Sequence, residues 1–443
     1  MKDAIMESLS IMARWIGAFA HYRNVAILAF GNLIAIFGYA MFNPIMSFYL
    51  FDYLKMSMLV VGLVTAVFGV VRALLQPVMG RLSDRIGRKK MIVPSLFSYA
   101  LVGYLYSTAG TAMEFIGYRA LQGATSSTLW PASDALVSET VSSKERARAL
   151  GTVSMTYQIG TILAPSVGSV VAGIWGFKEV FYACALLALI GATLSLVFLK
   201  EPKRYTIKPS SHEGNNHAVN DIVDKNSTSG ILARQKSSKS VDPIINNRRR
   251  LIAFLGLMTF LLLFTFSTVD MILSIFIMVY YGTTLIDFAI IYGIFSLIGG
   301  IAAIIGGTLA DKYGKRKLLK IVTISCIVSW LSFAFANTLT LLVLLVCMFV
   351  FMATMNGPAT LSLLADLTPT ERRGATFGFL GLCNDLGLVA GPIVGGIVFD
   401  FLSTSLCLNM LGAMQCVFIL NALTSLAAAV VVFYGVKEPK TRY

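Results

Sequence analysis

Long apolar stretches alternate with short polar segments along almost the whole chain. Residues 251–269, LIAFLGLMTFLLLFTFSTV, are a typical example. An α-helix needs about 20 apolar residues to cross the hydrocarbon core of a bilayer. The pattern therefore predicts an all-α membrane protein with 12 transmembrane helices, at residues 24–50, 57–79, 91–109, 113–137, 149–174, 180–199, 251–281, 286–309, 318–336, 339–364, 375–399 and 411–434.

The composition excludes an ordinary soluble protein. Of the 443 residues, 56% are hydrophobic and only 13% are charged. A soluble globular chain has about 25% charged residues. The low share of charge supports the membrane assignment.

The basic residues lie mainly on one side of the predicted helices. The 36 Lys and Arg residues fall in or next to the loops and tails of that side, except Lys55, Lys178, Arg72 and Arg119. Because Lys and Arg stay cytoplasmic, both termini should be cytoplasmic. The net charge of +14 then reflects topology and not nucleic-acid binding. We expect a multi-pass monomer in the cell membrane, in contact with lipid and a small-molecule substrate.

Three segments lie outside the predicted bundles. Residues 1–23 repeat apolar side chains at helical spacing, which favours an amphipathic helix on the membrane surface. A frayed tail is the alternative. Residues 201–250 are rich in Ser, Asn, Lys and Arg, so we expect a disordered cytoplasmic linker. Residues 437–443 form a short tail. The bundles are then residues 24–200 and 251–436.

The chain contains an internal duplication. A constant shift of 227 positions places Gly80, Asp84, Gly87, Pro131 and Glu139 on Gly307, Asp311, Gly314, Pro358 and Asp366. One ungapped shift that links several helices predicts two six-helix halves in the same orientation. Parallel repeats of this kind are typical of secondary transporters.

The duplication includes two basic turns, GRLSDRIGRKK at residues 80–90 and GGTLADKYGKRK at 306–317. Glycine permits a tight turn, and an Asp can interact with the N-terminal end of a helix. Arg88 can pair with an acid, and the shift nominates Glu139. We expect these contacts to form only when the cytoplasmic face is closed, as a conformational latch; a pure topology signal is the alternative. The latch residues are Gly80, Asp84, Arg85, Gly87, Arg88, Glu139, Gly307, Asp311, Gly314, Lys315 and Asp366.

These segments resemble the major facilitator superfamily, whose loop motif is similar to both basic turns. RALQG, at 119–123, resembles the family's fourth-helix motif, and GTILAPSVGS, at 160–169, the fifth-helix motif of its drug:proton antiporter branch. GLVAGPIVGG, at 387–396, is a second copy. The resemblance implies the major facilitator fold and links Arg119 to proton movement. It also implies gating by Gly160, Pro165, Gly168, Gly391, Pro392 and Gly395.

Four ionisable residues, Arg72, Arg119, Asp270 and Asp385, fall well inside predicted helices. Each costs about 2.5–3.5 kcal/mol to insert, so a functional role is the default and a structural ion pair is the alternative. Burial favours a protonated carboxyl group, so Asp385, and next Asp270, are our preferred proton-coupling residues alongside Arg119. From helical spacing and the repeat shift, we expect a substrate cavity formed by Asn32, Tyr39, Asn43, Arg72, Gln76, Gln122, Ser126, Trp130, Gln158 and Asn384.

The sequence leaves several functions open. The first is proton-coupled export of small amphipathic organic compounds. The second is proton-coupled import of a small organic anion, held by Arg72 and Arg119. A third is a sensor that retains the fold without transporting. No phosphate loop, metal-ligand cluster or nucleophile–base spacing stands out, so we expect neither an enzyme nor a bound cofactor or metal.

Overall fold

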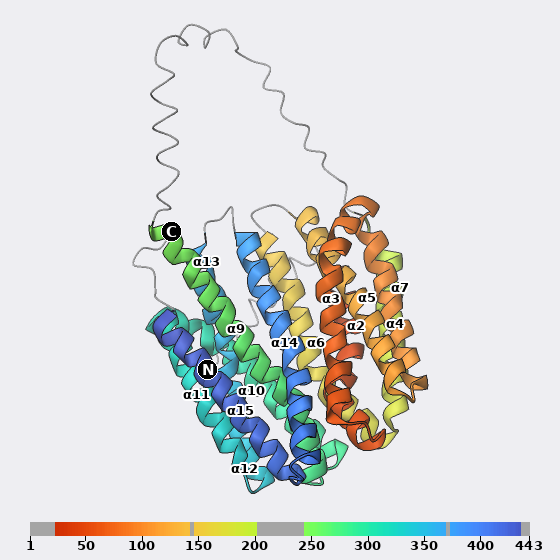
Figure 1. Cartoon of the computed structure of the whole chain (residues 1–443). Helices are drawn as coiled ribbons and strands as arrows, with labels where there is room; N and C mark the ends of the chain where they lie inside the picture. Colours follow the sequence, from red (N-terminus) through yellow and green to blue (C-terminus); the bar gives the residue numbers. More distant parts are fainter. Residues whose placement is uncertain (1–22, 142–145, 202–242, 369–372, 436–443) are drawn as a thin grey trace, which may run out of the picture.

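The computed structural model describes residues 23–141, 146–201, 243–368 and 373–435. The predicted N-terminal amphipathic helix, most of the predicted linker and the C-terminal tail lie outside these ranges. The described chain is helical throughout (Figure 1). The first half contains α2 (Arg23–Phe48), α3 (Met58–Ile86), α4 (Arg88–Thr108), α5 (Ala112–Thr140), α6 (Arg146–Ile174) and α7 (Phe177–Phe198).

The second half repeats this order. It contains α9 (Pro243–Ile275), α10 (Leu285–Tyr313), α11 (Lys315–Ala334), α12 (Leu339–Thr354), α13 (Asn356–Leu367), α14 (Arg373–Thr404) and α15 (Met410–Val430). Short π-helical turns, η1 (Tyr49–Tyr53), η2 (Phe276–Tyr280) and η4 (Val431–Gly435), extend α2, α9 and α15. Because α12 and α13 together make one crossing, the described helices give the predicted twelve.

Ten of the twelve crossings are long and apolar enough to span a membrane by composition alone. The other two are α5 and α6; in α6 only Ile159–Ile174 is an apolar stretch of that kind, and it is shorter than a full span. Helix α5 carries buried polar side chains, among them Arg119, Gln122 and Ser126, which lower its hydropathy. These buried polar groups lie in the interior of the protein, where they find partners.

Most helix ends shift by a few residues from the prediction, and two differences change the predicted organisation. Helix α9 begins at Pro243, so residues 243–250 are helical instead of belonging to the linker. The predicted 339–364 helix is divided between Thr354 and Asn356. Pro358 explains the break, because a proline ring clashes with the carbonyl group four residues earlier and removes one hydrogen bond. That earlier residue is Thr354, where α12 ends.

The two halves pack through α3 against α14 and through α6 against α10. We call the end of the bundle that carries residues 86–88, 201 and 243 the linker end, and the opposite one the far end. At the far end, Asp400 of α14 accepts hydrogen bonds from the backbone N–H groups of Met58 (3.0 Å) and Leu59 (2.8 Å), which begin α3. A side chain at Gly62 would overlap the carbonyl group of Pro392.

This packing does not continue along the whole of α3. Its buried residues lie between Met58 and Ala66, apart from Ser83 near the other end of the helix. Cβ atoms added at Gly378 and Gly381, near the linker end of α14, would meet no atom within 4 Å. Among the described residues, the halves are therefore close at the far end and separate toward the linker end.

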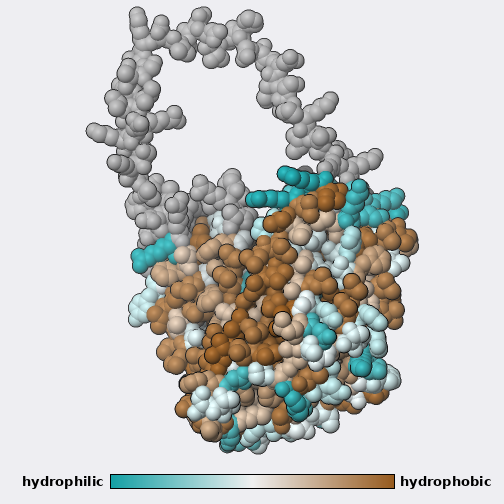
Figure 2. Space-filling model, turned by 45° about the vertical axis from the view of Figure 1, so that its right-hand side comes forward, coloured by the Kyte–Doolittle hydropathy of each residue, from teal (hydrophilic) through white to brown (hydrophobic). Residues whose placement is uncertain are grey.

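The outer surface is suited to lipid. Figure 2 shows hydrophobic side chains over the middle of one face and hydrophilic ones gathered at the linker end. Large apolar side chains such as Leu74, Leu297 and Leu344 are more than 60% exposed. Such exposure is unfavourable in water and ordinary in a bilayer, so this surface is the lipid-facing one.

Candidate functional site

A central cavity of about 340 Å³ lies between the halves. Its walls come from α2, α3, α5 and α6 on one side and from α9, α10 and α14 on the other. All four ionisable residues that the sequence places inside the membrane line it: Arg72, Arg119, Asp270 and Asp385. Tyr39 and Asn43 line it too, as helical spacing predicted.

Arg72 and Asp385 form an ion pair across the cavity, between the Nη2 and Oδ1 atoms. Arg72 belongs to α3 and Asp385 to α14, so the pair joins the two halves of the protein. Both side chains are mostly buried, at 23% and 18% exposure. Opposite charges attract strongly where water is scarce, so this pair stabilises the approach of α3 to α14.

Arg119 is held differently. It is 3% exposed and donates hydrogen bonds to Gln122 Oε1 (2.9 Å) and Asn43 Oδ1 (3.0 Å). Tyr106 donates to the same Gln122 oxygen at 2.9 Å. The described hydrogen bonds of this guanidinium thus go to neutral acceptors of its own half. A buried charge with only neutral partners costs free energy, and this cost favours a functional role for Arg119.

Asp270 is the acid of the second half. Its Oδ1 accepts a hydrogen bond from the Tyr292 hydroxyl of α10 at 2.8 Å. Tyr292 is not among the cavity residues predicted from helical spacing. The repeat shift would have found it, because it places Tyr292 on Thr65, which lies on the cavity face of α3.

Several predicted cavity residues lie elsewhere. Asn32 is buried and donates to Ser133 Oγ at 3.4 Å, so it joins α2 to α5. The Trp130 ring packs edge-on against Tyr157 at 4.8 Å. Gln122 lines a small adjoining cavity. The described lining of the central cavity does not include Gln76, Ser126 or Asn384, and the Gln158 side chain lies outside the described ones. Helical spacing predicts the direction of a side chain but not its depth.

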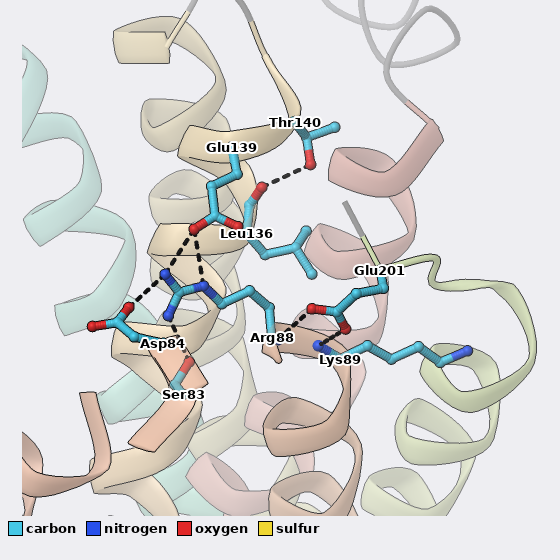
Figure 3. A network of polar contacts seen from close by, with 8 residues as sticks. All are labelled: Ser83, Asp84, Arg88, Lys89, Leu136, Glu139, Thr140 and Glu201. Atoms are coloured by element: carbon cyan, nitrogen blue, oxygen red, sulfur yellow. Dashed lines mark hydrogen bonds and ion pairs between the residues drawn. The ribbon is translucent and has the colours of Figure 1, made fainter. Parts of the chain in front are cut away.

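The first basic turn is the centre of a polar network (Figure 3). Gly87 joins α3 to α4 with a φ of +117°, which favours glycine. Arg88 Nη2 contacts Asp84 at 2.6 Å and Glu139 at 2.7 Å, and Nη1 donates to Ser83 Oγ at 2.8 Å. The predicted pairing of Arg88 with Glu139 is therefore present.

Glu201 completes this network, although it is not among the predicted latch residues. Its carboxylate accepts hydrogen bonds from the backbone N–H groups of Arg88 (2.6 Å) and Lys89 (2.8 Å) (Figure 3). These groups form the N-terminal end of α4, where a negative charge is favourable. The sequence does contain a signal for Glu201: the tetrapeptide KEPK follows the last predicted helix of each half, at 200–203 and 437–440.

The second basic turn repeats the arrangement. Gly314 has a φ of +94°, and Lys315 Nζ contacts both Asp366 and the carbonyl oxygen of Ser362. The side chains at positions 307 and 311 lie outside the described ones. In both turns the described contacts join helices of one half, and they form although the halves separate at this end. These contacts are thus present in this conformation, and their role as a conformational latch stays a prediction.

The motif glycines on α6 and α14 also act within each half. A side chain at Gly168 would overlap the backbone of Met41 on α2, and one at Gly391 would overlap Phe264 on α9. Glycine thus lets each helix approach its neighbour closely. Their role in gating stays a prediction, as do those of Gly160, Pro165 and Gly395.

Comparisons with known proteins agree with this architecture. The family model described as Major Facilitator Superfamily matches residues 28–357 and 255–443. Multidrug resistance protein 2 of Bacillus subtilis is 28% identical over 388 residues, which cover 85% of this chain and 89% of the relative. The multi-drug resistance efflux pump PmrA homolog of Lactococcus lactis is 26% identical, over 77% of this chain and 79% of the relative.

Solved structures show the same fold. A bacterial homolog of the human lysosomal transporter Spinster, in an inward-facing and occupied conformation, superposes with a TM-score of 0.77 at 15% identity, covering 95% of this chain and 98% of the other. A D-xylose-proton symporter gives a TM-score of 0.69 at 16% identity, covering 94% and 98%. At these identities the likeness concerns the fold alone.

Proposed function

The chain belongs to the major facilitator superfamily, and from this premise we propose that it exports small amphipathic organic compounds in exchange for protons. The family match confirms the resemblance that the sequence carries. With the twelve-helix fold, it identifies a multi-pass membrane transporter and not an enzyme. Proton coupling, alternating access and the direction of transport are the proposed part.

The ion pair between Arg72 and Asp385 is the observation that carries the proposal. A carboxylate can hold the guanidinium or take up a proton, but a protonated carboxyl group binds the guanidinium far more weakly. Uptake of a proton by Asp385 would therefore loosen α3 from α14. Release of that proton would restore the contact. This coupling between protonation and the distance between halves is what proton-driven alternating access requires.

The proposed orientation places the linker end in the cytoplasm, together with both termini, in the cell membrane. The described conformation, close at the far end and separated at the linker end, then admits substrate from the cytoplasm. The charges of the cavity and the aromatic rings of Tyr39 and Phe68 suit a molecule with polar and apolar parts. The names of the two bacterial relatives, a multidrug resistance protein and an efflux pump, support export. We propose a monomer as the working unit.

Purified protein in liposomes tests the proposal through Asp385→Asn. We expect this variant to lose uphill transport under an imposed proton gradient. It should retain counterflow, because exchange of substrate across the membrane needs no net proton movement. Asp52→Asn, an exposed change at the far end, is the matched control and should pump normally. Normal uphill pumping by Asp385→Asn would refute the coupling role of Asp385.

The alternative, import of an organic anion, is supported by Arg119, which has neutral partners in the described contacts. The engagement of Arg72 by Asp385 counts against a clamp of two arginines. Arg72→Lys separates the two functions, because lysine retains the charge but cannot make a bidentate contact with a carboxylate. Loss of anion binding in Arg72→Lys would favour import.

A further inference from the structure

A second, larger chamber lies inside the second half, beside the central cavity. It has a volume of about 530 Å³ and is walled by α9, α10, α11 and α12, with Ile159 of α6 at its edge. Most of its lining is aromatic or aliphatic, including Phe266, Phe295, Trp330, Phe333, Val346 and Phe349. Phe266, Asp270 and Tyr292 line both spaces, so the chamber meets the central cavity there.

The repeat explains why this chamber exists. The shift of 227 positions places Gly299 on Arg72 and Val346 on Arg119. It also places Phe349 on Gln122. In the first half, the equivalent positions are divided between two spaces. Tyr106 and Gln122 line a cavity of only about 20 Å³, and Arg72 lines the central cavity. The second half has smaller or apolar residues at these positions, so it gains volume and loses charge.

The chamber is elongated. A neighbouring cavity of about 290 Å³ shares Phe266, Phe349, Val350 and Thr354 with it and reaches Gly357 at the break between α12 and α13. On α9 the two spaces extend from Leu273 to Leu262, a rise of about 16 Å along a helix. An elongated apolar space suits a linear chain better than a compact ring system.

We propose that this chamber, the tail chamber, binds the unbranched hydrocarbon tail of an amphiphile whose polar head stays in the central cavity. The head lies against Asp270, which accepts one hydrogen bond from Tyr292 and has no cationic partner in the described contacts. An ammonium group on the head complements this carboxylate. The proposal rests on the proposed function, since it identifies a class of exported molecule.

Primary alkylamines of increasing length, from hexyl to hexadecyl, test the chamber by binding to purified protein in nanodiscs. Each added methylene should tighten binding about fourfold, which corresponds to ~0.8 kcal/mol, until the chamber is full. A variant with Trp330 as its sole tryptophan reports contact. Trp330 is fully buried away from lipid, so a bromine at the end of a bound tail should quench its fluorescence.

Gly299→Leu should fill the chamber, because a Cβ atom there would lie 3.4 Å from Val350 Cγ1. We expect short amines to bind as in the wild type and the gain from longer tails to disappear. Gly117→Leu is the control, because a Cβ atom at Gly117 would meet no atom within 4 Å. Ala303→Leu serves as a second filling variant if Gly299→Leu does not fold.

Three results would overturn the tail chamber: an unchanged dependence on chain length in both filling variants, no quenching of Trp330, or quenching by bromine-tailed bilayer lipid alone. The binding measurement needs no proton gradient. Tail binding without uphill transport by the wild-type protein would therefore refute the proposed function and leave the chamber in place. Uphill transport without tail binding would refute the tail chamber and leave the proposed function in place.

Discussion

The two halves have the same skeleton but fill it differently. The first half fills its interior with Arg119, Gln122 and Tyr106, which are buried and hydrogen-bonded to one another. The second half has Val346, Phe349 and Phe333 at the equivalent positions and keeps an open chamber. The two copies of a duplicated fold can therefore have different roles. One copy holds charge in a rigid polar network, and the other offers apolar volume.

Of the substitutions proposed here, Arg119→Ala should have the largest effect, because it disrupts the polar network of the first half. It removes two charge-assisted hydrogen bonds, each of about 1.5–3 kcal/mol, so we expect a loss of at least about 100-fold in proton-driven transport. Arg119→Lys should keep part of the activity, because it retains the charge. Transport assays in liposomes measure both. Lys178→Ala, in the first turn of α7 at the far end, is the control. Full activity of Arg119→Ala would show that the polar network is only structural.

Tyr292→Phe examines the polar edge of the apolar half. It removes the hydrogen bond to Asp270, of about 1.5–3 kcal/mol, and should weaken amine binding about tenfold or more. Tail-length dependence should be unchanged, because the chamber keeps its walls. The same amine series provides the measurement. A change in the chain-length dependence, with no change for short amines, would contradict the division between head and tail.

Asp400→Asn addresses the contact between the halves at the far end. The carboxylate accepts two hydrogen bonds at the N-terminal end of α3, an interaction of up to about 2 kcal/mol in partly buried sites. We expect far-end opening to increase several-fold. Labelling of a cysteine that replaces Val61, a buried residue in the first turn of α3, measures it in an otherwise cysteine-free protein with and without Asp400→Asn. Equal labelling rates would show that Asp400 does not control closure.

Substitutions in the two basic turns should have the smallest effects on transport. Asp84→Asn should slow transport several-fold and leave expression and substrate binding intact, since Asp84 is exposed and contacts Arg88 at the surface. Asp311→Asn, the repeat equivalent, should have a smaller effect. Initial rates at saturating substrate measure both. Wild-type rates in both variants would reduce the turns to a topology signal.

The fold could be predicted well from two features of the sequence, the apolar stretches and the internal repeat, because each is a physical constraint on the chain. Apolar length defines each crossing, and the repeat shift predicts which residues share a place in the two halves. The pairing of Arg88 with Glu139 followed from the shift alone. The helix break at Met355 could have been anticipated from Pro358, but the apolar stretch there is continuous.

The site was predicted in part. Burial cost identified Arg72, Arg119, Asp270 and Asp385, and all four line one cavity. Which acid pairs with which arginine could not be predicted, because it depends on how the halves meet. The tail chamber was also out of reach. An empty volume depends on how far apart four helices lie, and a pattern of apolar residues is the same for a filled core and a hollow one.

Because nearly the whole wall of the tail chamber belongs to one half, the chamber should move as a rigid body when the halves rock. A tail bound there keeps the same neighbours whichever side the transporter faces. A ligand group that binds two states equally shifts no population between them. The length of the hydrocarbon tail would then determine which molecules are carried. The head and the proton, which bind between the halves, would determine the direction of transport.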